Sequence, residues 1–153
     1  KTIGMGAMKF YLLRVDPKKK MIFNPEESID FHGFTGPFVQ YTHARIKSIL
    51  RKEAVTNEVA DYSVLLPLEK ALLVALEQFE GILVQAAKEL NPSALAIYVF
   101  NLAKSFNSFY TAHSIGNAES AEKKQLRLQL AVMVSNVLKT GMRLLGINVP
   151  ERM

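Results

Sequence analysis

The sequence predicts an all-α protein, built as an antiparallel helical bundle behind a short N-terminal stem. Apolar residues recur at helical spacing through most of residues 67–144, which favours helices that pack against a common core. Proline follows a polar or small capping residue at 35–37 and at 91–92, a pattern typical of helix starts. Besides helices, we expect at most a small extended piece over residues 21–23.

Residues 1–32 predict short helical segments. Residues 6–14 resemble the end of a helix that closes before Asp16-Pro17, because the residue before a proline avoids the helical region. The lysines at 18–20 predict a solvated turn. Pro25 opens a further helical turn, with Glu26 and Glu27 at the positive end of its dipole.

The next helix is expected from Pro37 to Lys52, with Thr35 or Gly36 immediately before it. Residues 53–63 are polar and lack a sustained period, so they predict a flexible connection. A long helical stretch then begins at Pro67.

Gly81 is a candidate break within that stretch. The second long helix starts after Asn91-Pro92, an N-cap followed by proline, and the third is capped by Ser120 or Asn117. Gly146 suits the left-handed residue that ends the third helix. The expected buried positions are Leu68, Leu72, Ala75, Phe79, Leu83, Ala86 and Leu90; Leu95, Val99, Leu102, Phe106 and Phe109; and Leu126, Leu130, Met133, Val137, Gly141 and Leu144.

Length and composition limit the class of protein. A chain of 153 residues suffices for one domain with a core. It has no cysteine, which excludes disulfides and thiolate zinc sites. No apolar run approaches the ~18–20 residues that span a bilayer, so we expect no membrane insertion. The start lacks both Met and the pattern of a signal peptide, and we expect the chain to be part of a longer protein.

Charge is unevenly placed along the chain. Residues 1–52 carry a net +6, residues 53–118 a net −4 and residues 119–153 a net +3. Basic ends around an acidic middle indicate an anionic partner that contacts the ends. Such asymmetry also arises by chance on solvated faces, so alone it favours neither interpretation.

No catalytic or metal-binding pattern is present. His32, His43 and His113 are isolated, without a second ligand at metal-binding spacing, and we expect them to be surface or capping residues. The sequence contains no Gly-x-Ser-x-Gly motif, phosphate-binding loop or complete dinucleotide fingerprint.

The most informative stretch is residues 33–52, GFTGPFVQYTHARIKSILRK. A turn of small residues leads into a helix whose first turns carry Phe38 and Tyr41, and basic residues follow from Arg45 onward. Rings near a helix start, followed by cations, form a surface that can stack bases and hold phosphates. The same rings could equally be core.

Two separated segments resemble arginyl-tRNA synthetases. The run TGPFVQYTHARIKSIL is similar to the segment that joins the catalytic domain of that family to its C-terminal helical domain. The ending GMRLLGINVPERM is similar to the family's C-terminus, which characteristically finishes in Pro-Glu-Arg-Met. The resemblance implies that residues 1–32 are a stem following the catalytic domain and that residues 33–153 form the anticodon-binding domain. It also accounts for the missing ATP-binding signatures, which belong to the catalytic domain.

The chain departs from the family pattern at three places. Residues 6–9 read Gly-Ala-Met-Lys where the fold is named for an Asp-Ala-Leu-Arg run. Phe34 stands where Asn is usual, and Phe38 stands where Tyr is common. The sequence does not decide whether the two phenylalanines alter base recognition.

Carried over by motif, the resemblance implies tRNA contacts through Phe38, Tyr41, Tyr110 and Met153, with Arg45 as a phosphate or anchoring partner. Gln40, which could read a base edge, and Arg152, next to Met153, complete the seven candidate tRNA-binding residues. An unstacked anticodon loop offers base faces that rings or a thioether can cover, while arginine supplies phosphate affinity.

Each of these residues also has a structural interpretation. Phe38 could pack as a hydrophobic staple, and Gln40 could be buried within the bundle. Tyr110 lies one step off the buried stripe of its helix. Arg45 could pair with Asp61 or Glu58. By default, Arg152 and Met153 would form a frayed terminus.

The resemblance implies recognition of the anticodon stem-loop of tRNA(Arg) by a monomeric cytoplasmic enzyme, with no DNA or membrane partner. That enzyme would attach arginine with ATP and Mg²⁺, whereas this chain would hold no cofactor and be inactive alone. Two alternatives stay open: a helical protein-interaction bundle, and the anticodon module of a cysteine or methionine synthetase. The PERM ending and the TGPFVQYTHAR run argue against the second.

Overall fold

The computed structural model describes residues 2–53, 55–56, 60 and 62–153. Within this part of the chain every regular element is a helix, which confirms the predicted all-α class, and residues 21–23 form no strand. The helices are α1 (Thr2–Leu13), α2 (Pro25–Ser28), α3 (Gly36–Lys52), α4 (Pro67–Glu77), α5 (Phe79–Glu89), α6 (Pro92–Ala112) and α7 (Ala121–Leu144).

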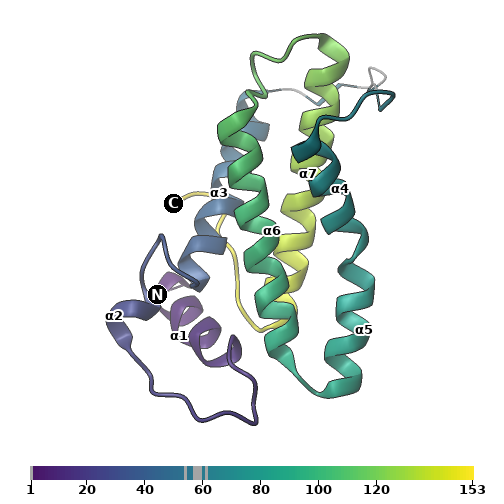
Figure 1. The fold of residues 1–153 in the computed structure, drawn as a ribbon. Helices are drawn as coiled ribbons and strands as arrows, with labels where there is room; N and C mark the ends of the chain where they lie inside the picture. Colours follow the sequence, from purple (N-terminus) through teal and green to yellow (C-terminus); the bar gives the residue numbers. More distant parts are fainter. Residues whose placement is uncertain (1, 54, 57–59, 61) are drawn as a thin grey trace.

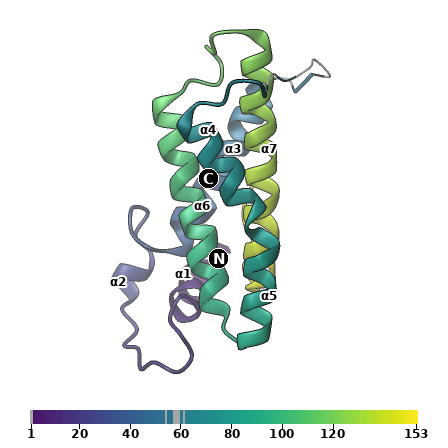
Figure 2. The same ribbon diagram turned by 45° about the vertical axis from the view of Figure 1, so that its right-hand side comes forward.

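The long helices run side by side as a bundle, with α1 and α2 at one end beside the start of α3 (Figures 1 and 2). Helix α6 is antiparallel to α7 and to the consecutive pair α4 and α5, and it packs against all three and against α3. After α7 the chain returns without regular structure toward α3, beside which the C-terminus lies (Figure 1).

The predicted helix caps are present. The Thr35 side chain accepts the N–H of Phe38, that of Asn91 accepts the N–H of Ser93, and that of Ser120 accepts the N–H of Lys123. Each satisfies a backbone donor that a helix start leaves without a partner. Capping therefore begins α3, α6 and α7 where the sequence predicts.

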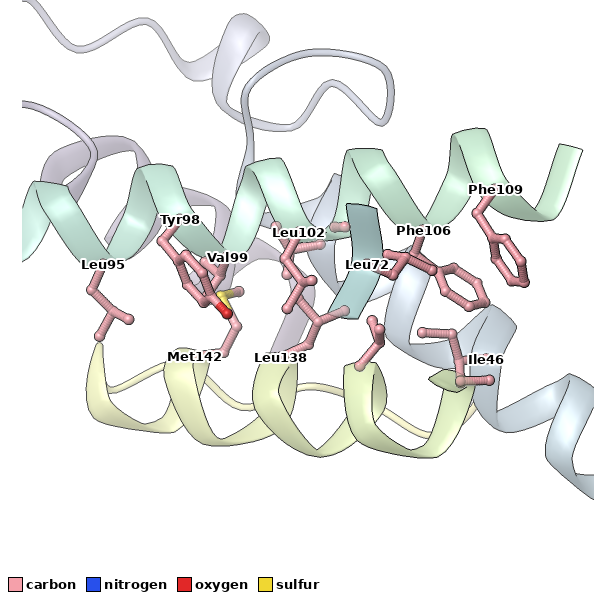
Figure 3. Packing of buried hydrophobic residues seen from close by; sticks show 14 of the residues in the cluster. Ile46, Leu72, Leu95, Tyr98, Val99, Leu102, Phe106, Phe109, Leu138 and Met142 are labelled. Carbon is pink, nitrogen blue, oxygen red and sulfur yellow. The ribbon is translucent and has the colours of Figure 1, made fainter. Parts of the chain in front are cut away.

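The core lies between α6 and the helices that surround it. Leu102, Phe106 and Phe109 from α6 are fully buried, and they meet Ile46 of α3 and Leu138 of α7 (Figure 3). The predicted stripe of α6 is confirmed along its whole length.

The α4–α5 stretch differs from the prediction in its break and in its burial: of the predicted stripe only Leu72 is fully buried, and the predicted residues of α5 are at most half-buried. The break falls at Gln78 rather than at Gly81, which lies inside α5 with open space around it. The turn at Gln78 keeps Phe79 on the side of α6, where its ring stacks on Tyr98 at 5.7 Å between centroids. Leu90, predicted as buried, is 84% exposed because it is the left-handed residue that ends α5.

Helix α7 also departs from its predicted stripe. Met133 and Leu144 are exposed, and the fully buried line includes Leu128, Val134 and Leu138 instead. The physical reason is that α7 packs against α3, α4 and α6 together, so it buries more than one face. A single stripe cannot describe such a helix.

A buried ion network joins α7 to the start of α4. The Arg127 Nε lies 2.9 Å from Glu69 Oε1, and Lys123 Nζ lies 2.9 Å from Glu69 Oε2. Burial by itself raises the pKa of Glu69, but hydrogen bonds from Lys123, the Leu66 N–H and Arg127 outweigh burial and hold that pKa below its ordinary value. The network fixes the end of the bundle away from α1.

Helices α1 and α3 approach closely through glycines. A Cβ on Gly36 would lie 2.7 Å from the Gly6 carbonyl oxygen and 2.9 Å from the Phe10 Cβ. Phe10 is fully buried and belongs to the common core. Helix α1 therefore shares the core of the helices that follow it. The division of the chain at residue 32 stays a prediction.

We expect Gly36→Ala to destabilise the protein by about 1–3 kcal/mol, because the added methyl meets backbone and Cβ atoms that cannot rotate away. Urea denaturation followed by circular dichroism measures this change. Gly4→Ala on α1 is the matched control, since its Cβ meets nothing within 4 Å and it should stabilise by up to about 1 kcal/mol. Equal effects of the two substitutions would contradict the close approach.

Candidate nucleic-acid interface

The start of α3, which carries the Phe38 and Tyr41 rings, is tied to the loop that precedes it. Buried Thr35 donates its hydroxyl to the Asp30 carbonyl and accepts the Phe38 N–H, so the loop and the helix start are tied together. Phe38 is half-buried and packs its ring 5.0 Å from that of Phe100 on α6. One turn further, Tyr41 is 42% exposed. Helix α3 therefore has a half-buried ring, Phe38, and an exposed ring, Tyr41.

The chain after α7 is anchored to the bundle by alternate side chains. Leu145 and Ile147 are buried and Val149 is half-buried against the core, whereas Gly146 and Asn148 are exposed. This period of two is typical of extended chain lying on a surface. We call residues 145–153 the C-terminal tail.

Side chains from other elements bind the carbonyl groups of the C-terminal tail. Lys9 Nζ donates to the Gly146 oxygen at 2.7 Å, and Gln40 Nε2 donates to the Asn148 oxygen at 2.8 Å. The His43 Nδ1 lies 2.9 Å from the Pro150 oxygen. Because a carbonyl oxygen only accepts, this His43 nitrogen carries the proton.

The C-terminal tail ends at the exposed rings of α3. Met153 is 47% exposed, and together with Tyr41 and Arg45 it lines two adjoining clefts of about 710 and 380 Å³. The larger cleft is lined by Ile3, Phe31, His32, Phe38, Tyr41, Arg45, Asn107 and Met153. The smaller is lined by Tyr41, Ala44, Arg45, Ser48, Arg51, Arg152 and Met153.

Arg45 connects the rings of two helices. Its guanidinium carbon lies 5.4 Å from the Tyr41 ring centroid and 5.5 Å from that of Tyr110 on α6, within cation–π range. It also donates to Asn107 Oδ1 at 3.2 Å. The alternative partners Asp61 and Glu58 lie outside the described residues.

The structure thus brings six of the seven predicted residues to one surface. Phe38, Tyr41, Arg45, Arg152 and Met153 line the clefts, and Tyr110 joins them through Arg45. We call these six residues the ring-and-tail surface.

Gln40 is the exception. It is fully buried and its amide is engaged with the C-terminal tail and packed against Gly6, so a base meets it only if the tail leaves. His43 also differs from expectation: it is neither a surface nor a capping residue but is fully buried beneath the tail.

Sequence reasoning did not find Phe31 and Asn107. The Phe31 ring lies 6.5 Å from that of Tyr41 in an edge-to-face arrangement, and Phe31 is 43% exposed. An apolar ring in a polar loop next to a helix start was its only signal. Asn107 precedes Tyr110 by three residues on α6, a spacing that puts both on one helix face and could have identified it.

The environment of His43 lowers its pKa below the ordinary value of about 6.5. Burial is the main cause, and the positive charges of Lys47 and Lys139 act in the same direction. The Pro150 hydrogen bond and the charge of Glu151 act in the opposite direction. A neutral imidazole with its proton on Nδ1 therefore holds the C-terminal tail at neutral pH.

No three His, Asp or Glu side chains in the described part of the chain are placed to share a metal ion. Over the same residues, none of the helices combines the length and apolar character needed to cross a bilayer. The ring-and-tail surface is thus a site of aromatic rings, arginines and a thioether.

Residues 39–153 match the family described as the DALR anticodon binding domain, and the chain belongs to that family. The resemblance inferred from residues 35–50 and 141–153 is confirmed.

Curated relatives of this chain include arginine–tRNA ligases. The enzyme of Flavobacterium psychrophilum is 50% identical over this whole chain, and that of Phocaeicola vulgatus is 45% identical; the chain spans 26% of each. Among solved structures, Thermus thermophilus arginyl-tRNA synthetase matches with a TM-score of 0.91 at 39% identity, over 99% of this chain and 27% of that one. The Plasmodium falciparum enzyme matches with a TM-score of 0.84 at 25% identity, over 97% of this chain and 26% of that one.

We expect the free energy of unfolding to fall as pH drops below about 6.5, because the unfolded chain then binds a proton that buried His43 resists. The stability that neutral His43 contributes is complete above that pH and is lost as pH falls through its lowered pKa. Urea denaturation of wild type and His43→Asn between about pH 8 and pH 5 measures the difference. Parallel pH profiles for the two proteins would contradict this assignment.

Proposed function

We propose that the ring-and-tail surface binds unstacked nucleotides of the anticodon loop of tRNA(Arg). The observation that carries this proposal is the convergence of Tyr41, Arg45 and Met153 on two adjoining clefts, although Met153 is distant from the other two in sequence. Rings and a thioether cover base faces, while arginines hold phosphates. The membership of the chain in an anticodon-binding family supports this reading.

The wider role follows from the relatives. In an arginine–tRNA ligase this module would recognise the anticodon and help to place the acceptor end of the tRNA in a catalytic domain. The attachment of arginine, with ATP and Mg²⁺, would belong to that domain and not to the ring-and-tail surface. We include in the proposal a monomeric state and a cytoplasmic location, with no DNA or membrane partner. The relatives reported above are arginine enzymes, which favours arginine over cysteine or methionine.

A titration separates this function from unspecific attraction between basic protein and RNA. The chain is titrated with the anticodon stem-loop of an arginine tRNA and with the same stem-loop carrying a substituted middle anticodon base. We expect tighter binding of the unchanged stem-loop, since edge and stacking contacts depend on the base. Equal affinities, or the absence of binding to both, would overturn the proposal.

Tyr41→Ala should weaken binding of the anticodon stem-loop by about 1–3 kcal/mol, because a base loses its stacking partner. Fluorescence anisotropy measures the dissociation constant. Tyr41→Phe keeps the ring and should retain most of the affinity. Tyr62→Ala removes a similarly exposed tyrosine near α7 and is the matched control. Unchanged affinity of Tyr41→Ala would remove Tyr41 from the site.

Arg45→Gln should make the salt dependence of RNA binding shallower by about one phosphate contact, or roughly 0.7–0.9 in the slope of log affinity against log salt. The measurement repeats the titration at several salt concentrations. Lys88→Gln, an exposed cation on α5, is the control and should leave the slope as in wild type. A slope unchanged in Arg45→Gln would assign Arg45 to packing between Tyr41 and Tyr110 alone.

A further inference from the structure

The C-terminal tail changes its mode of attachment at Pro150. Up to Val149 it is anchored by apolar side chains, whereas residues 151–153 are exposed. The contact between His43 and the Pro150 oxygen is the last partly buried hydrogen bond before Met153 among the described residues. Beyond it, Arg51 donates to the Glu151 oxygen at the exposed surface, at 3.1 Å.

These contacts bind the backbone of the tail and do not involve the side chains of Arg152 and Met153. Gln40 and His43 each use a donor on a carbonyl oxygen, and their Oε1 and Nε2 atoms have no protein partner among the described residues. The hydrogen bond to the tail is therefore the one that each buried side chain makes within the described protein. Within the part of the chain that the structure describes, the tail alone accounts for these two buried polar side chains.

The distance from Pro150 to Met153 is short. Three residues of extended chain reach about 10 Å at most, so the position of the Pro150 carbonyl restricts where the Met153 side chain can lie. Met153 lines both clefts together with Tyr41, two residues before His43 on α3. The Pro150 carbonyl, which His43 holds from beneath the tail, thus restricts where the Met153 thioether can lie beside the exposed Tyr41 ring.

We propose that Gln40 and His43 are positioning residues, which hold the backbone of the C-terminal tail so that Arg152 and Met153 stand ready beside Tyr41 for an anticodon nucleotide. This inference rests on the proposed function for the identity of the ligand. The ordering of the tail before RNA arrives lowers the entropy that binding would otherwise cost. Neither residue contacts the nucleotide itself.

The test compares four variants, and the combination of two of them, with wild type. His43→Leu removes the donor, and His43→Asn keeps a donor at the position of Nδ1. A chain lacking residues 152–153 removes the groups that the tail presents. Ile46→Val lowers stability from the same helix without removing a hydrogen bond to the tail, because Ile46 is an apolar core residue of α3.

The first readout is the affinity for the anticodon stem-loop. We expect His43→Leu and the shortened chain each to bind about tenfold more weakly, and His43→Asn to stay within about twofold of wild type. If His43 acts through the tail, His43→Leu has no further effect in the shortened chain, since the two changes remove one shared contribution. Additive losses, or an equal loss in Ile46→Val, would overturn the positioning role.

The second readout needs no RNA. The methyl group of Met153, assigned by its absence from the shortened chain, should give an NMR signal shifted by the Tyr41 ring in wild type and in His43→Asn. In His43→Leu the signal should move to the position of a mobile methionine. If His43→Leu does not fold, Gln40→Met provides the same comparison. An unmoved signal would overturn the positioning role, whereas a shifted signal without wild-type RNA binding would overturn only the proposed function.

Discussion

The backbone of the C-terminal tail needs hydrogen-bond partners, and this need determines much of the structure. After α7 the chain forms neither helix nor strand, so its carbonyl groups depend on side chains from elsewhere. Helix α3 supplies most of them, from Gln40, His43 and Arg51. The inner face of α3 therefore carries polar residues where a simple core helix would be apolar. The same helix consequently serves the core, the tail and the exposed surface.

The aromatic residues around the start of α3 divide into packing and exposed groups. The Phe34 ring lies 5.6 Å from Phe10 and 4.7 Å from Phe100, so the residue that departs from the family's usual Asn fills space between α1 and α6. Phe38 shares the contact with Phe100 and leaves part of its ring to the cleft. The structure thus assigns Phe34 to packing. The open rings are Tyr41 and, from the loop, Phe31.

The uneven charge of the sequence becomes an uneven charge in space. Basic residues from the first and last parts of the chain meet at α3, where Arg45, Arg51 and Arg152 line one cleft. The acidic middle of the chain forms α4 and α5 on another side of the bundle (Figure 1). Arg127 is basic but is itself buried and is neutralised by buried Glu69 and by exposed Glu119, so it adds nothing to the exposed positive surface.

The sequence by itself determined the helical class, most helix boundaries and the position of Phe38 and Tyr41 in the first turns of α3, because caps, prolines and apolar spacing are local signals. It failed at the Gln78 break and on α7, where packing against several neighbours decides which face is buried. Gln40 and His43 could not be assigned from sequence, since their partners lie more than a hundred residues away and are backbone atoms, which carry no sequence signal. Only the tertiary structure brings Met153 to Tyr41, because contacts along the returning chain, and no local preference, decide where its end lies.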